Sequence, residues 1–411
     1  MQMLGMRKNY KLMTTKNNIP AGYKDSAVGI IPQEWEVKTF QECFHISAGR
    51  DLQKEYYSEK QTLQYQYPIF SNSLENRGLY GYTSNPRHKA GSITITGRGM
   101  LGVAEYRDVD FDAIVRLLVL YPKKEIAGQV VTEYINYRKP FYFESTGVPQ
   151  LTAPQISNIP IPVPPLAEQR KIAEILGVWD EAIEKQSRLI EKLELRKRAL
   201  MQRLLTGRTR LPGFTTPWQK CLYSDILKEV KRTMSWDDNE EYDLISVKRR
   251  SGGLFYRERL YGRDIKTKNL RPAKCGDFLI SKMQIVHGAS GLVTDEFDGM
   301  KISGSYIALV AKNSNYINMD FINWYSKTPY FYHQTYVSSY GVHIEKMTFD
   351  LESFMSMNVM LPPLPEQKAI AEVLTAADDE IATHRKKLDA LRLQKRGLMQ
   401  QLLTGKTRVK I

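Results

Sequence analysis

The side chains that could do chemistry in this chain are mainly arginine, lysine, tyrosine and histidine, and they gather in glycine-rich loops. Arginine and lysine neutralise phosphates, arginine forks onto guanine, and asparagine or glutamine pairs with adenine. These loops therefore predict a DNA-contacting surface, whereas each residue taken singly fits a solvated basic face equally well. The candidates are Arg50, Lys54, Tyr57, Arg77, Tyr80, Tyr82, Arg87, His88, Lys89, Arg98, Lys231, Arg232, Lys248, Arg249, Arg250, Arg257, Arg259, Arg263, Lys282, His287, Tyr340 and His343.

Motifs for catalysis are missing from the same sequence. The LLTGKT string near the C-terminus contains Gly-Lys-Thr, but a phosphate-binding loop needs a glycine at position 400, which is Gln400, so a helix cap is the better interpretation. Glu36 and Lys38 with Asp25 mimic a nuclease carboxylate set, yet the matching second segment, WQK, has no glutamate. The six histidines show no metal-ligand spacing, and no nucleophile elbow or base-methyltransferase motif occurs. We therefore expect a non-catalytic chain with no metal or cofactor of its own.

The amino-acid composition also favours nucleic acid as the partner. The chain has 411 residues, which suits two or three domains, and 59 basic against 45 acidic residues give a net charge of +14. On a chain that is 42% hydrophobic, this excess points to nucleic acid before membrane. Three widely spaced cysteines, no apolar leader and no run of 18 apolar residues predict a cytoplasmic protein that neither is secreted nor spans a membrane.

The elements that must position these side chains repeat within the chain. Residues 164–210 align without a gap onto residues 362–408, at a constant offset of about 198 positions. More faintly, WEVKTFQECF at Trp35 matches WQKCLYSDIL at Trp218, AGSITITGRG matches CGDFLISKMQ, and STGVPQLT matches SYGVHIEK. We therefore predict five segments: an N-terminal extension at 1–19, a first domain at 20–163, a first helix at 164–208, a second domain at 209–361, and a second helix with a tail at 362–411.

Each repeated segment reads as one long helix with a heptad seam. Prolines precede it, Gly207 or Gly405 follows it, and about 40 residues give a rod of roughly 60 Å. We expect the two helices to pack together as an antiparallel coiled coil; the alternative is that each packs on its own domain. The seam residues are Ile172, Leu176, Ile183, Gln186, Ile190, Leu193, Lys197, Leu200 and Leu204 in the first helix, and Ile370, Leu374, Ile381, His384, Leu388, Leu391, Lys395, Leu398 and Leu402 in the second.

The two domains, which we call head one and head two, read as α+β folds with mixed sheets. Short runs such as SITITG, IVRLLVLY, FLISK and YIALVA favour strands. The heads differ in sequence while the helices stay alike, so two heads of one fold would read two different short sequences at a gap that the helices fix. A coiled-coil scaffold protein would leave the +14 charge unexplained, and a stand-alone DNA-processing enzyme would need a catalytic site that the sequence lacks.

The repeated strings resemble a known family. PPLAEQRKIAEIL with LLTGRTR, and PPLPEQKAIAEVL with LLTGKTR, are similar to the conserved regions of the specificity subunits of type I restriction-modification systems. The resemblance covers about residues 20–408 and includes GDFLISK and SYGVHIEK, stretches typical of target recognition domains. It implies two target recognition domains separated by two long antiparallel helices that form a coiled coil, with a pseudo-two-fold internal repeat, and a bipartite DNA target.

The resemblance also implies partners. Two modification subunits would carry S-adenosylmethionine and methylate adenine, and restriction subunits would bring ATP and Mg²⁺ for translocation, all in a prokaryotic cytoplasm. This chain would be the non-catalytic reader of the complex. Apolar residues off the seam, namely Ile175, Leu189 and Leu195, are expected to face the modification subunits. In the second helix their matching positions are Val373, Lys387 and Leu393, so Leu189 has no apolar counterpart.

Overall fold

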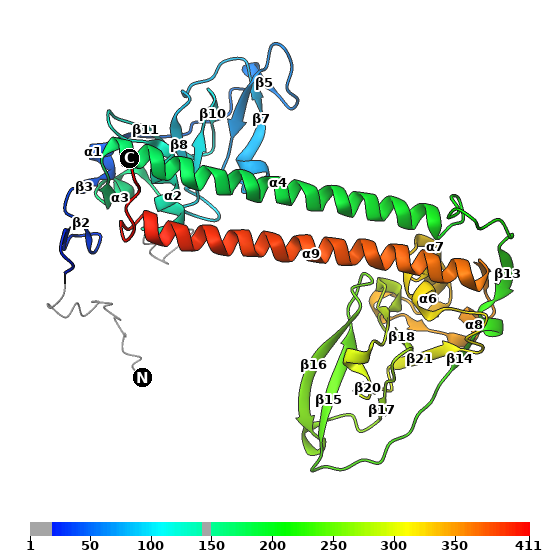
Figure 1. Cartoon of the computed structure of the whole chain (residues 1–411). Coiled ribbons are helices and arrows are strands. Elements are labelled where there is room, and N and C mark those ends of the chain that lie inside the picture. Colours follow the sequence, from blue (N-terminus) through cyan, green and yellow to red (C-terminus); the bar gives the residue numbers. More distant parts are fainter. Residues whose placement is uncertain (1–18, 142–148) are drawn as a thin grey trace. The chain divides into compact units, whose positions relative to one another are not determined.

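The computed structural model describes residues 19–141 and 149–411 (Figure 1). The expected N-terminal extension, apart from Ile19, and the first part of the STGVPQLT stretch lie outside the described residues. The chain divides into two compact units: unit 1 is Met1–Gln186 with Lys387–Ile411, and unit 2 is Ser187–Lys386. Each unit therefore contains one head and one half of each long helix.

The two long helices are α4 (Leu166–Leu204) and α9 (Leu364–Leu402), each of 39 residues. Proline pairs precede both, where a missing N–H costs nothing. Gly207 (φ 68°) and Gly405 (φ 69°) follow in the left-handed region that closes a helix. The predicted helices and their glycine caps are confirmed. No helix in the described residues has the length and apolarity that a membrane crossing requires.

Within each unit the two helices run antiparallel. In unit 1, Ile172 and Leu176 share a hydrophobic cluster with Leu402, so the start of α4 meets the end of α9. In unit 2, Leu204 shares a cluster with Ile370 and Leu374, so the end of α4 meets the start of α9. The same clusters contain head residues, and each helix end therefore packs both on the other helix and on a head. The eighteen seam positions are all buried or half-buried.

The first sheet of each head repeats with one strand order. All neighbours are antiparallel, in the order β4-β11-β8-β9 in head one and β14-β21-β18-β19 in head two. Alternate side chains face the helices: Ile93, Ile95 and Leu120 pack against α2 (Gly128–Arg138) in the unit 1 core. The strands are β4 (Phe44–Ala48), β8 (Ser92–Ile95), β9 (Ala104–Arg107), β11 (Leu118–Pro122), β14 (Leu227–Glu229), β18 (Phe278–Ser281), β19 (Ser290–Leu292) and β21 (Tyr306–Ala311).

The second sheet lies against the other face of the first, because Val119 in head one and Leu279 in head two point into a separate cluster. It contains one parallel pair in each head, β6 with β10 and β15 with β20. The orders are β10-β6-β7-β5 and β16-β15-β20-β17. The strands are β5 (Tyr57–Ser58), β6 (Tyr67–Phe70), β7 (Leu79–Thr83), β10 (Asp112–Ala113), β15 (Glu241–Val247), β16 (Leu254–Tyr261), β17 (Leu270–Pro272) and β20 (Lys301–Ser303).

Small elements complete the repeat. A two-stranded sheet joins the entry of each head to the strand before its long helix, as β3 with β12 and β13 with β24. These strands and the remaining elements are β1 (Tyr23–Lys24), β2 (Ile31–Pro32), β3 (Glu36–Thr39), β12 (Pro160–Val163), β13 (Gln219–Leu222), β22 (Ser339–Tyr340), β23 (Thr348–Phe349), β24 (Asn358–Leu361), α1 (Phe40–Cys43), α3 (Ala153–Ser157), α5 (Tyr223–Ile226), α6 (Met319–Tyr325), α7 (Pro329–Val337) and α8 (Leu351–Met355). The repeated strand order confirms the mixed α/β fold with an internal repeat.

One predicted strand is shorter than the sequence suggested. The run IVRLLVLY reads as continuous strand, but β11 begins only at Leu118. Ile114–Leu117 forms a turn in which Val115 (φ 53°) and Arg116 (φ 60°) are both left-handed. The backbone of this turn hydrogen-bonds to Gly49 and Arg50, which overrides the strand propensity of its β-branched residues. This turn belongs to the candidate site.

Candidate nucleic-acid interface

A buried glutamate at the start of α4 fixes head one to both helices. Glu168 is fully buried, and its carboxylate accepts hydrogen bonds from Trp35 Nε1 (2.9 Å) and from Arg408 Nε (2.7 Å) and Nη2 (2.9 Å). Trp35 comes from the entry of the head, and Arg408 comes from the segment after α9. A buried carboxylate is tolerated when a cation and hydrogen-bond donors satisfy it, as here. We call this arrangement the clasp.

The second clasp repeats the first with the matching residues. Glu366, at the start of α9, is fully buried and accepts from Arg210 Nε and Nη2 (2.5 Å each) and from Trp218 Nε1 (3.2 Å). Arg210 follows α4, so each head is closed by the segment that follows the opposite helix. The sequence showed the matching Glu, Trp and Arg positions, but spacing alone did not reveal that they meet.

The glutamine beside each clasp glutamate holds the loop that leads into a head helix. Gln169 Oε1 accepts from Ala127 N (2.7 Å), and its amide nitrogen donates to Glu125 O and Pro164 O. Gln367 Oε1 accepts from Asn318 N (2.9 Å), and its Nε2 donates to Tyr316 O and Pro362 O. The Glu-Gln pair therefore positions α2 and α6 identically in the two units, and the heads are presented on equivalent supports.

Three exposed arginines, Arg50, Arg98 and Arg116, lie on loops that hydrogen bonds join at one corner of head one. The carbonyl of Arg50 accepts from Val115 N, and the amide of Arg116 donates to Gly49 O, both at 3.2 Å. Asn72 ties in the third loop, because its Oδ1 accepts from Arg98 N (3.2 Å) and its Nδ2 donates to Val115 O (2.6 Å). In the described part of this head, other cations, namely Arg77, Arg87 and Lys89, form ion pairs with carboxylates. We call Arg50, Asn72, Arg98, Val115 and Arg116 the loop corner of head one.

The matching loops form the loop corner of head two, which we define as Lys248, Arg249, Arg250, Lys282 and His287. The amide of Arg250 donates to His287 O (2.7 Å), and Lys282 N donates to Ser305 O (2.9 Å). Phe349 N donates to Lys282 O, as Leu151 N donates to Gly97 O in head one. The two corners thus share this one backbone connection, while their other hydrogen bonds and their side chains differ.

Both corners contain strained backbone. Val115 and Arg116 in head one, and Arg250 (φ 57°) and Ser251 (φ 53°) in head two, adopt consecutive left-handed conformations. Such a conformation is a true outlier for a β-branched residue such as Val115 and costs of order 1–3 kcal/mol per residue. Backbone strain of this kind concentrates at binding and active sites. These two pairs therefore lie at the loop corners, whereas a third pair, Asn76 (φ 47°) and Arg77 (φ 56°), lies in head one outside its loop corner.

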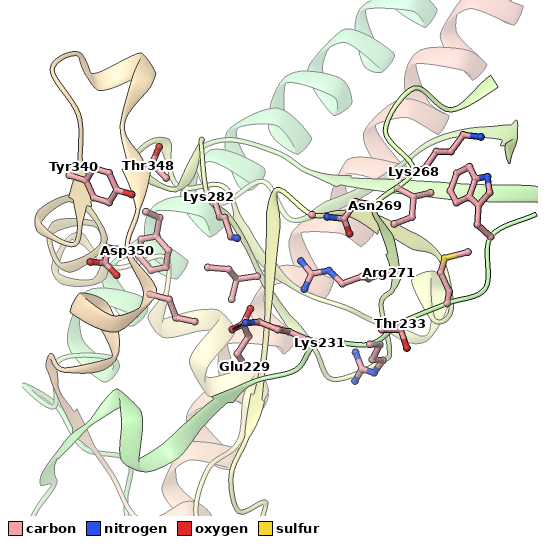
Figure 2. Close-up of a pocket in the computed structure, with 18 residues that line it drawn as sticks. Glu229, Lys231, Thr233, Lys268, Asn269, Arg271, Lys282, Tyr340, Thr348 and Asp350 are labelled. Carbon is pink, nitrogen blue, oxygen red and sulfur yellow. Dashed lines mark ion pairs between the residues drawn. The ribbon is translucent and has the colours of Figure 1, made fainter. Parts of the chain in front are cut away.

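A pocket of 820 Å³ opens beside Lys282 in head two (Figure 2). Figure 2 shows Asn269, Arg271 and Lys282 pointing toward one another inside it. Arg271 Nη2 donates to Tyr306 O (2.6 Å), whereas its buried Nε has no hydrogen-bond partner in the described residues. Carboxylates pair with other cations of the lining, Lys231 with Glu229 (3.1 Å) and Lys268 with Asp238 (2.7 Å). Arg271 and Lys282 therefore give this pocket a positive charge suited to a phosphate.

The structure gives three predicted contact residues a role inside the heads instead. Arg87 forms a bidentate pair with the buried Asp112 (2.7 Å for both bonds), and Arg232 forms one with the buried Asp277. His88 is buried and stacks on Phe111 and Tyr121, and burial lowers its pKa. Because a cation bound to a buried carboxylate is costly to withdraw, we remove these three from the DNA-contacting candidates.

Most of the other predicted residues lie on the second sheets and their loops, whereas Tyr340 and His343 lie in the hairpin of β22 and β23. Carboxylates engage several of them: Arg77 with Glu105, Lys89 with Asp110, Arg249 with Glu345, Arg257 with Glu258 and Arg259 with Asp243. Tyr57 and Tyr80 pack their rings together at 5.8 Å, Tyr82 lines an 810 Å³ pocket, and Arg263 lies over the Tyr261 ring. Lys54, Tyr340 and His343 are exposed. The sequence thus placed basic side chains on several surfaces, and the structure brings only a subset together.

Sequence reasoning missed Asn72, Arg116, Asn269 and Arg271. Arg116 was hidden in an apparent strand, and Arg271 lies in the stretch RDIKTKNLRPAK, which is basic but contains no aromatic residue. Consecutive left-handed residues such as Val115 and Arg116 leave no compositional signal, because neither is glycine, asparagine or aspartate. In the described residues, no group of three or more His, Cys, Asp or Glu side chains is arranged to hold a metal ion.

Comparison with known proteins identifies the family. The family model described as "Type I restriction modification DNA specificity domain" matches residues 32–195 and 224–393. A putative type I restriction enzyme specificity subunit of Methanocaldococcus jannaschii is 24% identical, over 94% of this chain and 97% of its own. A putative type I specificity subunit of Mycoplasma pneumoniae is 31% identical over 32% of this chain and 36% of its own.

Solved structures share the fold. The crystal structure of the type I restriction-modification S subunit from M. genitalium superposes with a TM-score of 0.60 at 14% identity, covering 92% of this chain and 96% of that one. A chain from a study of complex assembly and conformational transition in the type I R-M system gives 0.54 at 16% identity, covering 92% and 99%. The chain belongs to the family of type I restriction-modification DNA specificity domains and contains two copies of the domain. It is a specificity subunit, and the matched domain is one of DNA recognition, not of catalysis.

Proposed function

We propose that this specificity subunit reads a bipartite DNA sequence, with the loop corner of head one on one half-site and that of head two on the other. The observation that carries the proposal is the pair of corners: loops at the ends of first sheets that share one strand order present different side chains in the two heads. One scaffold with two sets of contacts is suited to two unlike half-sites. In this arrangement residues 20–163 and 209–361 are the two recognition domains, and the long helices at 164–208 and 362–411 set the gap.

The corner residues have the chemistry for both parts of recognition. Arg50, Arg98 and Arg116 offer planar guanidinium groups that bind phosphates or fork onto guanine, and Asn72 offers an amide edge. In head two, Lys282 of the corner and Arg271 of the adjoining pocket supply charge beside Asn269. Arginine contacts to bases contribute about 1–3 kcal/mol of discrimination each. Exposed residues of the second sheets, such as Lys54, would add phosphate contacts that carry no sequence information.

The long helices are proposed to dock two modification subunits. Leu195 is 61% exposed and its counterpart Leu393 is 66% exposed, so α4 and α9 present an equivalent apolar contact. Ile175 and Val373 pack against the unit cores, and Leu189 faces Lys387 in the alignment, so these are removed from the proposed interface. S-adenosylmethionine with its adenine chemistry, and ATP with Mg²⁺, would belong to the modification and restriction subunits of a complex in a prokaryotic cytoplasm.

A map of methylated adenines tests this function. The chain would be co-expressed with its candidate modification subunit, and methylated adenines would be mapped across the host genome by single-molecule sequencing. The expected result is one bipartite motif with a fixed gap. A stable, catalytically active complex that leaves no motif would overturn the proposal and favour a scaffold role for the long helices.

A further inference from the structure

An apolar hairpin projects from head two beside its loop corner. Strands β22 and β23 pair Ser339 with Phe349 and Tyr340 with Thr348, and the intervening residues form the tip. The tip side chains are among the most exposed apolar groups in the described residues: Val342 is 94% exposed, Tyr340 65% and Ile344 50%. Large apolar side chains clustered on a surface mark a contact with another molecule.

The tip is held in place by contacts with the head. Glu345 pairs with Arg249 (3.2 Å) and lies 3.3 Å from His287, both of which belong to the loop corner. The amide of Lys346 donates to His343 O (2.8 Å), and Met347 and Phe349 are buried at the base. A Cβ at Gly341 would lie 2.9 Å from Met347 Cα, so only glycine lets the two sides of the hairpin approach this closely. The apolar tip is therefore presented rigidly.

Basic residues lie beside the tip. Arg249 pairs with Glu345 at its base, Lys346 is exposed at the end of the turn, and Lys282 is joined to the base of the hairpin through its backbone carbonyl, which accepts from Phe349 N. Apolar side chains flanked by basic residues fit a partner that has anionic groups on its outside and apolar groups inside. A DNA duplex is such a partner, because its stacked bases lie between its phosphates. An apolar protein surface would need no cations around the contact, so DNA is the favoured occupant.

We propose that the Tyr340–Ile344 tip is a wedge that enters a groove of the DNA and partly unstacks a base step in the half-site read by head two. This rests on the proposed function. Apolar side chains inserted between base steps unstack and kink a duplex, and a stiff β-branched residue such as Val342 loses little side-chain freedom in doing so. Head two would then select its half-site partly by how easily a step opens, and not only through base contacts.

The test uses the specificity subunit in complex with its modification subunit and duplexes that carry the mapped motif. 2-Aminopurine is placed in turn at positions of the half-site of head two other than the methylated adenine. Binding of the wild type is expected to raise fluorescence at one step. Val342→Ser should abolish that rise and weaken specific binding at least tenfold, whereas Val342→Ile should retain both. Val337→Ser, at a 49% exposed residue of α7 outside the hairpin, is the matched control and should behave as wild type.

The outcomes separate the wedge from the function on which it rests. Equal fluorescence and affinity in the wild type and Val342→Ser would overturn the wedge while leaving the reader intact. Loss of the modification subunit from Val342→Ser, with the DNA response of the remaining complex unchanged, would also overturn it and assign the tip to a protein contact. If the wild-type complex shows no sequence-specific binding, the proposed function itself fails.

Discussion

Head one and head two are alike where they meet the long helices and differ where they face outward. The clasps around Glu168 and Glu366 use the same three residue types, and the first sheets have the same strand order. The second sheets differ: head one adds β5 beside β7, whereas head two adds β17 beside β20, and its antiparallel strands β15 and β16 are longer than β6 and β7. The support is constant, and the contact surface varies.

This difference separates two demands on the sequence. Residues of the clasp are buried and satisfy one another, so a change at any of them leaves a polar group without its partner. Most residues of the loop corners are exposed to solvent, so they can change without a comparable loss of stability. A protein built in this way can acquire a new half-site through its loops while its helices and clasps stay fixed.

Exchange of a whole head gives the largest expected effect. Replacing residues 20–163 with the first head of another family member should change one half of the methylated motif completely and leave the other half and the gap unchanged, because the clasp and the helices remain. Single-molecule sequencing of the methylated genome is the measurement. A change in both halves would contradict the separation of support from contact surface.

Breaking either clasp should destabilise its own unit by about 3–5 kcal/mol, because removal of the arginine strands a buried carboxylate. Arg408→Ala should act on unit 1 and Arg210→Ala on unit 2, with similar magnitude. Hydrogen exchange of β8 and β11 against β18 and β21 would report each unit separately. Lys171→Ala, which removes only an exposed pair with Glu174, is the control and should cost under about 1 kcal/mol.

The difference between the helices with their clasps and the outward-facing loops also explains what the sequence could predict. The helices, their caps and the repeat were predictable because prolines, glycines and heptad spacing are local signals, and here they agree with the tertiary packing. The loop corners were only partly predictable. Arg50, Arg98 and Lys282 stood out by type, but no local signal distinguishes them from Arg87 and Arg232. Buried carboxylates at Asp112 and Asp277, far away in sequence, decide that difference.

The polar seam positions offer a smaller contrast. Lys395 contacts the half-buried Glu133 (2.7 Å) and Asp180 (2.6 Å), whereas its counterpart Lys197 pairs with the more exposed Asp378. Lys395→Met should therefore cost about 2 kcal/mol, and Lys197→Met under about 1 kcal/mol. Chemical denaturation that follows unit 1 and unit 2 separately would measure the two values. If both variants lost the same free energy of unfolding, burial of Glu133 would not explain a difference between Lys395 and Lys197.

The Lys395 variant should also depend on pH in a defined direction. Desolvation raises the pKa of Glu133, and Lys395 opposes that shift. Without Lys395 the pKa rises further, so the ionised carboxylate destabilises the folded state above that pKa. The cost of Lys395→Met should consequently shrink as the pH falls from about 8 to about 5 and Glu133 takes up a proton. A cost that grew on acidification would assign the effect to other groups.

The smallest expected effect concerns charge at the loop corners. Lys282→Ala should weaken DNA binding about tenfold through loss of one phosphate contact, and it should lower the slope of log affinity against log salt by about one. Arg98→Ala in head one, if Arg98 forks onto a base, should instead relax the base preference at one position of its own half-site. Titrations on motif and scrambled duplexes over a range of salt distinguish these behaviours, because a phosphate contact is lost equally from both. The opposite result would be that Lys282→Ala alters base preference and Arg98→Ala changes only the salt slope. In that case Lys282 would contact a base and Arg98 a phosphate, contrary to the inference from their side chains.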